Sequence, residues 1–207
     1  MLLSKKKRYI YIHIPKTAGV SVKNALLPLS VNNLQLLLWH VSKHIKFAGV
    51  LSSQKFPTHI VASDLIGLIG RDVFDSYFSF AFVRNPWDWL VSLYKYMLKS
   101  ADHPKHSFVK GLGTFDEFIR WRCARQIRLQ KDFICSKDGK QLVDFVGRFE
   151  RIDEDFQRIC FKIGISTSLP KLNISNTKPY REFYTDETRD LVMSAYHPDI
   201  TFFNYNF

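Results

Sequence analysis

The chain has 207 residues, enough for a substantial hydrophobic core, and its 46% hydrophobic and 15% aromatic content excludes the composition of a disordered protein. A formal net charge of +11 predicts a surface that attracts polyanions, yet no zinc-finger spacing, RNA-recognition signature or helix-turn-helix pattern is present, so sequence-specific nucleic-acid binding is not expected. No linker divides the sequence, and we predict a single domain over residues 1–207.

The cysteines and the apolar runs indicate the environment of the chain. Cys123, Cys135 and Cys160 have neither CxxC nor zinc-finger spacing, so we predict no metal site and no disulfide framework. A reducing compartment is the simplest expectation, and a bond between Cys123 and Cys135 stays open. No run approaches the ~18 apolar residues of a membrane span. The opening MLLSKKKR has two leucines, whereas a signal peptide needs a longer apolar core. We expect a soluble protein.

Two parts of the sequence each predict a strand, a polar turn and a helix. The run RYIYIHI at residues 8–14 is typical of a strand covered on both faces of a parallel sheet, and residues 20–27 predict a helix that stops near the proline that follows. FSFAFV at residues 78–83 predicts a second strand, after which Asn85 as N-cap and Pro86 at the first helical position begin another helix. Two such units predict an α/β fold with a central, mostly parallel sheet flanked by helices.

The remaining segments predict more helices and a third strand. The predicted elements are a helix near residues 33–40, a helix that follows His59, a helix capped by Thr114, a strand over residues 144–150, a helix over residues 152–164 that ends at Gly164, and a C-terminal helix with Asp186 and Glu187 in its first turn.

The first polar turn, PKTAGVS, has the residue types of an anion site. Helix N-termini expose N–H groups and carry positive partial charge, and Gly19 would let an anion approach the backbone there. Thr17 and Ser21 bring hydroxyls, and Lys16 brings a cation. The order of these residues is not the nucleotide-binding pattern GxxxxGK[ST], which disfavours a plain ATPase or kinase. From this turn alone, a strand–helix connection with an incidental surface lysine stays open.

The second polar turn adds another cation. Arg84 stands at the end of the second strand, where ligands of open α/β sheets gather, and Ser92 lies about two turns into the next helix. Arg84 suits bidentate phosphate binding, and Ser92 can add a hydrogen bond. Each alone has a plain explanation as a surface residue. Together with the first turn, they predict a ligand with two separated anionic groups.

HIPKTAGVS followed by FAFVRNPWDWLVSLY resembles the two cofactor-binding elements of the sulfotransferases, specifically the carbohydrate sulfotransferase group that includes heparan 2-O- and chondroitin-type enzymes. The resemblance continues through HIVASDLIGLIGRDVFDSYF, FVGRFERIDEDFQRI, LPKLNIS and the C-terminal segment, so it covers nearly the whole chain. It implies a P-loop-like, three-layer α/β fold that binds 3′-phosphoadenosine 5′-phosphosulfate (PAPS) without a metal. The implied reaction moves the sulfuryl group to a hydroxyl of a carbohydrate acceptor and releases 3′-phosphoadenosine 5′-phosphate (PAP). The net charge suits an anionic polysaccharide as that acceptor.

The resemblance also implies which residues hold each end of the donor. The implied 5′-phosphosulfate loop is Lys16, Thr17, Ala18, Gly19, Val20 and Ser21, and the implied 3′-phosphate clamp is Arg84 and Ser92, with Asn173 close to the cofactor and therefore not glycosylated. Lys16 is the expected catalytic cation for the leaving group. Ala18 and Val20 replace a glycine and a threonine that the family usually has, and the methyl of Ala18 is harmless only at negative φ. Trp89 replaces an arginine of the family.

A general base must take the proton of the acceptor hydroxyl, and His59 is the expected residue. It precedes the SDLIGLIG helix and matches the family's histidine upstream of the second cofactor element, with His40 as the next candidate. His13, inside an apolar strand, is expected to be packed or hydrogen-bonded. Arg148 and Glu150 are expected either to form a buried ion pair or to contact the substrate.

Two other functions stay open on the sequence. A P-loop-like kinase of nucleotides or small molecules would bind ATP with Mg²⁺, and a non-catalytic relative would bind glycans or anions without turnover. Animal enzymes of the group that the chain resembles are Golgi membrane proteins. The expected location is therefore the cytoplasm for a bacterial source, and the Golgi lumen only if an anchor has been removed.

Overall fold

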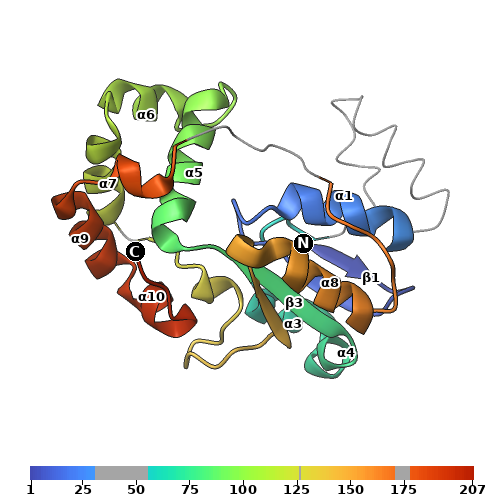
Figure 1. Ribbon diagram of the computed structural model, residues 1–207. Coiled ribbons are helices and arrows are strands. Elements are labelled where there is room, and N and C mark those ends of the chain that lie inside the picture. Colours follow the sequence, from blue (N-terminus) through green and yellow to red (C-terminus); the bar gives the residue numbers. More distant parts are fainter. Residues whose placement is uncertain (31–55, 126, 171–177) are drawn as a thin grey trace. The chain divides into compact units, whose positions relative to one another are not determined.

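The computed structural model describes residues 1–30, 56–125, 127–170 and 178–207 (Figure 1). The chain forms two compact units. Unit 1 comprises Met1–Val83 and Phe133–Asn173, and unit 2 comprises Arg84–Asp132 and Ile174–Phe207. The helix predicted near residues 33–40, with His40, lies outside the described residues, and so does Asn173.

Unit 1 is built on a small mixed sheet with the strand order β1-β2-β3-β4. β1 (Leu2–Ser4) pairs antiparallel with β2 (Tyr9–Ile12). β3 (Phe78–Val83) lies parallel both to β2 and to β4 (Phe145–Arg148). The three predicted strands are therefore confirmed, the first and third with tighter bounds. Of the three strand pairs in this sheet, β2–β3 and β3–β4 are parallel and β1–β2 is antiparallel.

Helices flank this sheet because its two central strands are apolar on both faces. Side chains alternate along a strand, and one face of β2 and β3 packs in a single hydrophobic cluster with α1 (Gly19–Ser30) and α8 (Ile152–Lys162). Buried aromatic side chains dominate that face: Tyr9, Tyr11, Phe80 and Phe82. The alternate set is also buried: Ile10, Ile12, Ala81 and Val83. In Figure 1, α8 lies in front of the sheet and α3 (Ala62–Ile69) lies behind it.

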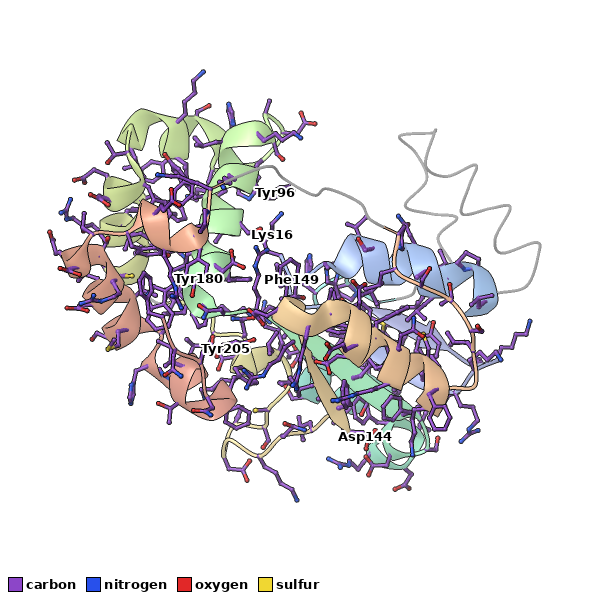
Figure 2. All side chains as sticks on the ribbon, in the orientation of Figure 1. Lys16, Tyr96, Asp144, Phe149, Tyr180 and Tyr205 are labelled. Atoms are coloured by element: carbon purple, nitrogen blue, oxygen red, sulfur yellow. The ribbon has the colours of Figure 1, made fainter. Side chains whose placement is uncertain are left out.

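Close contacts fix β3 against β4. A Cβ atom on Gly147 would lie 2.5 Å from the ring of Phe82, so only glycine fits at that point of β4. Just before β4, Asp144 (labelled in Figure 2) accepts hydrogen bonds through Oδ2 from the backbone N–H of Ser79 at 2.7 Å and from its hydroxyl at 2.8 Å. These contacts set the register of the two strands, and with it the position at which each strand ends.

Two helix ends differ from the predicted bounds. α1 continues through Pro28 to Ser30, so this proline lies inside the helix and does not end it. α8 ends at Lys162, and Gly164 follows with a φ of 63°, as expected for a glycine that ends a helix. Two short helices complete the described part of unit 1: α4 (Arg71–Asp75) and η3 (Phe149–Arg151).

Unit 2 is helical in the residues that the structure describes. Its helices are α5 (Pro86–Lys99), α6 (His106–Leu112), α7 (Phe115–Cys123), η4 (Tyr180–Phe183), α9 (Asp186–Ala195) and α10 (His197–Phe203). A further turn, η2 (Lys131–Phe133), spans the boundary between the units. A cluster around Trp87, Leu90, Phe118 and Tyr196 forms the core of unit 2.

The predicted starts of these helices are confirmed where a capping residue marked them. The Asn85 side chain accepts from the Trp87 N–H, and the Thr114 side chain accepts from the Glu117 N–H. α6 was not predicted, because it begins inside the polar segment ADHPKHS and carries no capping side chain.

Cys123, Cys135 and Cys160 are free thiols, so the Cys123–Cys135 bond that the sequence left open is not formed. Within the described ranges, no helix combines the length and the apolar character that crossing a membrane requires.

Candidate active site

The first loop, between β2 and α1, has an unusual backbone. Lys16 and Ala18 have positive φ angles of 65° and 62°, whereas Thr17 between them does not. Alternation of this kind turns successive peptide N–H groups toward one side, which is the geometry of an anion-binding nest. A left-handed φ costs a residue with a Cβ atom about 1–2 kcal/mol. A negative φ is required for the Ala18 methyl to be harmless. The φ of Ala18 is positive, so its methyl is strained where glycine would not be.

The loop passes directly into the N-terminus of α1. The Val22 N–H donates to the Ala18 oxygen at 3.1 Å, and this is the first backbone bond of the helix. Helix geometry leaves the N–H groups of Gly19, Val20 and Ser21 without intrahelical acceptors. With the positive end of the helix dipole behind them, these N–H groups can bind an anion.

The side chains of this loop divide into three groups. Lys16, labelled in Figure 2, is half-buried at the turn between β2 and α1. The Thr17 hydroxyl is buried and donates to the Ile14 oxygen at 2.9 Å, so it stabilises the turn, and contact of Thr17 with an anion would use its backbone N–H. Val20 is 59% exposed and Ser21 is buried. The Val20 side chain has no hydrogen-bond donor, so only the backbone N–H of Val20 can bind an anion.

Gly19 is required by a neighbouring side chain. His13 is buried, and a Cβ atom on Gly19 would lie 1.8 Å from its Nε2 atom. That Gly19 lets an anion approach the backbone stays a prediction, and the structure shows that Gly19 also leaves room for the His13 imidazole. His13 itself is packed, as predicted.

His59 lies beside the first loop and is held through His13. Its Nδ1 atom is 2.9 Å from the backbone oxygen of His13, and the two ring centroids are 4.5 Å apart. A carbonyl oxygen only accepts hydrogen bonds, so Nδ1 carries the hydrogen in this contact, and Nε2 is the nitrogen of the neutral ring that accepts a proton. His59 is exposed, so a substrate hydroxyl can approach it. This is the arrangement that a general base needs.

His13 does not compete for that proton. Burial, followed by the charge of His59, lowers the pKa of His13 to about 3. His13 is therefore neutral at physiological pH. Lys23, one turn after Gly19 in α1, contributes to this shift, and burial lowers the pKa of Lys23 as well.

The second loop, in unit 2, presents Arg84 at the start of α5. The Arg84 side chain is 14% exposed, and its Nε donates to Asp88 Oδ2 at 2.7 Å. Ser92 is half-buried and follows Asp88 by four residues, so the two lie on the same face of α5. Arg84, through its ion pair with Asp88, and Ser92 therefore lie on the same face of α5.

Two buried polar residues fix the backbone of Arg84. The Gln130 side chain accepts from the Arg84 N–H at 2.9 Å and donates to the Arg84 oxygen at 2.7 Å. Asp199, fully buried, accepts from the N–H groups of Gln130 at 2.8 Å and Lys131 at 2.9 Å. Gln130 thereby joins the two ends of the segment Arg84–Asp132.

The sulfotransferase family model matches residues 1–206 of this chain. This chain belongs to the sulfotransferase family. It is similar to carbohydrate sulfotransferase 9 of Homo sapiens, with 24% identity over 242 residues that cover 97% of this chain and 52% of the human protein. The chain therefore spans about half the length of that relative. An uncharacterized protein of Archaeoglobus fulgidus is 30% identical over 118 residues, 55% of this chain and 91% of the archaeal protein.

In this sulfotransferase-family protein, His13 of unit 1 contacts both His59 and Gly19 of the first loop. Arg84 and Ser92 belong to unit 2. Trp89, where the sequence resemblance implied an arginine, is buried and packs edge-on against Tyr196 in the core of unit 2. Within the described part of the chain, no group of three or more His, Cys, Asp or Glu side chains is placed to hold a metal ion.

The sequence left two roles open for Arg148 and Glu150, and because Glu150 is exposed, a pair between them would not be buried. Asp155, in α8, takes the buried position instead. Its Oδ2 accepts from the Arg148 backbone N–H at 2.8 Å and from the Arg151 side chain at 3.1 Å. This carboxylate fixes the turn that follows β4.

Sequence reasoning missed Gln130, Asp155 and Asp199. Each is a single polar residue in a segment of mixed character, and no spacing or motif marks it. The one usable signal is Asp199, an acidic residue within HPDITFF, where a carboxylate between apolar residues indicates a buried hydrogen-bonding role.

Proposed function

We propose that this protein is a sulfotransferase that moves the sulfuryl group of PAPS to a hydroxyl of a carbohydrate acceptor and releases PAP. The observation that carries the proposal is the first loop, in which a nest of N–H groups and a helix N-terminus stand beside an exposed histidine with a fixed tautomer. Membership of the sulfotransferase family supports the transferase reaction, and the name of the human relative supports a carbohydrate acceptor.

The binding roles follow from the chemistry of each loop. In unit 1, the N–H groups of residues 16–21 and the ammonium of Lys16 would bind the 5′-phosphosulfate. In unit 2, Arg84 and Ser92 would bind the 3′-phosphate. Asn173 is proposed from the sequence resemblance alone. Because the family match extends over both units, we take residues 1–207 as one sulfotransferase domain.

The transfer would be an in-line displacement in which positioning and charge stabilisation lower the barrier. As the acceptor oxygen forms its bond to sulfur, Nε2 of His59 takes the hydroxyl proton. The bond between sulfur and the phosphate oxygen breaks, and its electron pair leaves with PAP. Lys16 and the loop N–H groups stabilise the negative charge on that phosphate. His59 then returns its proton to solvent.

Transfer of ³⁵S-labelled sulfate from PAPS to a panel of neutral and anionic glycans tests the proposal. Labelled product with at least one glycan is the expected result. Thermal shifts with PAP and with ATP–Mg²⁺ separate the other functions. Stabilisation by ATP–Mg²⁺ and not by PAP indicates a kinase. Stabilisation by PAP, or by a glycan, without transfer to any acceptor indicates a non-catalytic relative.

A further inference from the structure

Two lysines of unit 2 share one aromatic ring. The Nζ atom of Lys95 lies 4.4 Å from the ring centroid of Phe183, and that of Lys178 lies 4.6 Å from the same centroid. Both distances are within cation–π range. The two ammonium groups are therefore within about 9 Å of each other, close to the Debye length of ~8 Å at physiological salt, so they repel each other when no anion is present.

Lys95 also lies on the face of α5 that carries the proposed clamp. Asp88, Ser92 and Lys95 follow one another at intervals of four and three residues, which places them along one side of the helix. Arg84 is attached to this side through its ion pair with Asp88. Three cationic side chains thus converge on a short stretch of α5 and on the neighbouring η4, which carries Phe183.

The electrostatics of Lys95 agree with that placement. Burial lowers the pKa of Lys95, and the nearby positive charges of Arg84 and Lys178 lower it further, against the opposing effect of Asp88. The carboxylate of Asp88 is already engaged by Arg84. A bound dianion would reverse the repulsion among the three cations and stabilise their charged forms.

We propose that Lys95 and Lys178 bind the 3′-phosphate of the nucleotide donor together with Arg84 and Ser92. This inference rests on the proposed function and extends its clamp by two residues that lie outside the motifs recognised in the sequence. The Phe183 ring contacts both ammonium groups, and the Glu182 backbone oxygen accepts from Lys178 Nζ at 2.9 Å. This placement before the ligand arrives reduces the entropy lost when the phosphate is bound.

The test compares two nucleotides that differ only in the 3′-phosphate. PAP and adenosine 5′-monophosphate (AMP) are titrated by calorimetry into the full chain and into Lys95→Met and Lys178→Met. Methionine keeps the length and apolar stem of lysine and removes the charge. Each variant is expected to bind PAP about 10-fold more weakly, because it loses one charge-assisted hydrogen bond to the 3′-phosphate. Its affinity for AMP should stay the same. Lys110→Met, at an exposed position of α6, is the matched control and keeps both affinities.

The outcomes separate this inference from the function on which it rests. If the unaltered protein binds PAP no better than AMP, the proposed 3′-phosphate clamp itself is wrong. If it prefers PAP and Arg84→Ala removes that preference, while Lys95→Met and Lys178→Met retain it, the assignment of the two lysines is overturned.

A second measurement needs no variant. The unaltered protein is acetylated at lysines with and without PAP, and each site is quantified by mass spectrometry. PAP is expected to protect Lys95 and Lys178 at least several-fold but not Lys110, and AMP is expected to protect none of the three. Equal acetylation of Lys95 and Lys178 with and without PAP contradicts the proposal.

Discussion

The Nδ1 atom of His59 donates a hydrogen bond of 2.9 Å to the backbone oxygen of His13. His13 in turn fills the space beside Gly19, the first residue of α1. His13, which directly follows β2, therefore contacts both the expected base and the expected sulfate loop. Its backbone orients the base, and its side chain excludes any residue larger than glycine from the helix start.

Replacing His59 tests its role as the base. His59→Asn keeps an N–H that can donate to the His13 oxygen but removes the nitrogen that accepts a proton. We expect kcat for sulfate transfer to fall by roughly 10²-fold or more, with PAP affinity unchanged, because general-base catalysis contributes about that much. Stopped assays with labelled PAPS and calorimetry with PAP provide the two measurements. His197→Asn, at an exposed position, is the control, and full turnover in His59→Asn would remove His59 from the mechanism.

Gly19→Ala tests the packing of His13 against α1. The added Cβ would lie 1.8 Å from His13 Nε2, and overpacking of this kind costs about 1–3 kcal/mol or more of unfolding free energy. The double variant His13→Ala with Gly19→Ala should lose less stability than the two single variants together, since the ring that collides is gone. Gly67→Ala in α3, where a Cβ meets nothing within 4 Å, should be neutral or stabilising. Urea denaturation measures all four, and strict additivity would contradict the contact.

Ala18→Gly should stabilise the protein, against the usual effect of glycine. At a φ of 62° the methyl is strained by about 1–2 kcal/mol, and glycine removes this strain. Glycine also gains entropy in the unfolded chain, worth about 0.4–1 kcal/mol in the other direction. We expect a net gain of about 0.5–1 kcal/mol in unfolding free energy. Ala25→Gly, inside α1, should show the opposite sign. A loss of stability in Ala18→Gly would show that the loop is not left-handed there.

Gln130→Met tests whether the buried amide fixes Arg84. The variant keeps the side-chain volume and removes two hydrogen bonds to the Arg84 backbone. We expect PAP affinity to fall about 10-fold and AMP affinity to stay the same, since only the 3′-phosphate site depends on Arg84. Gln157→Met removes a comparable amide–carbonyl bond, to Thr167 in unit 1, and serves as the control. Equal losses for PAP and AMP would indicate a general structural role instead.

Asp199 gives unit 2 a pH dependence of defined sign. Burial raises the pKa of Asp199 to about 6, above about 3.9 in the unfolded chain. Between pH 4 and 6 the folded state therefore holds more protons, so the contribution of Asp199 to stability falls as pH rises through this window and is constant above it.

Comparing the unaltered protein with Asp199→Asn isolates that contribution. The difference in their unfolding free energies, measured in urea from pH 4 to 7, should change with this slope and level off above pH 6. The comparison is needed because His13, whose pKa is lowered to about 3, adds stability that is lost as pH falls from 6.5. Asp102→Asn, at an exposed position, is expected to leave the pH profile unchanged. A difference that is independent of pH would contradict the raised pKa of Asp199.

Local sequence signals predicted the elements that position the site. RYIYIHI and FSFAFV gave two neighbouring parallel strands, and Asn85 followed by Pro86 gave the start of α5. These signals succeed because apolar runs and capping side chains act over a few residues. The choice of His59 and of the first loop also came from local patterns, and their roles in sulfate transfer stay predictions.

Other features depend on contacts between residues far apart in the sequence. Gln130 and Arg84 are 46 residues apart, and Gln130 and Asp199 are 69 apart, so no periodicity connects them. The positive φ of Ala18 is imposed by how the loop closes onto α1, against the preference of alanine itself. The pairing of Lys95 with Lys178 through Phe183 likewise exists only after η4 packs against α5.

The bond pair between Gln130 and Arg84 has a consequence for how the protein can vary. Gln130 binds the backbone of Arg84, so the chain returns at residue 130 to the place that it left at residue 84. The length of the segment around α6 therefore need not affect the position of Arg84. Insertions or deletions around α6 would change the length of this segment while the backbone of Arg84 keeps its place. Changes in chain length are therefore easiest to accommodate around α6.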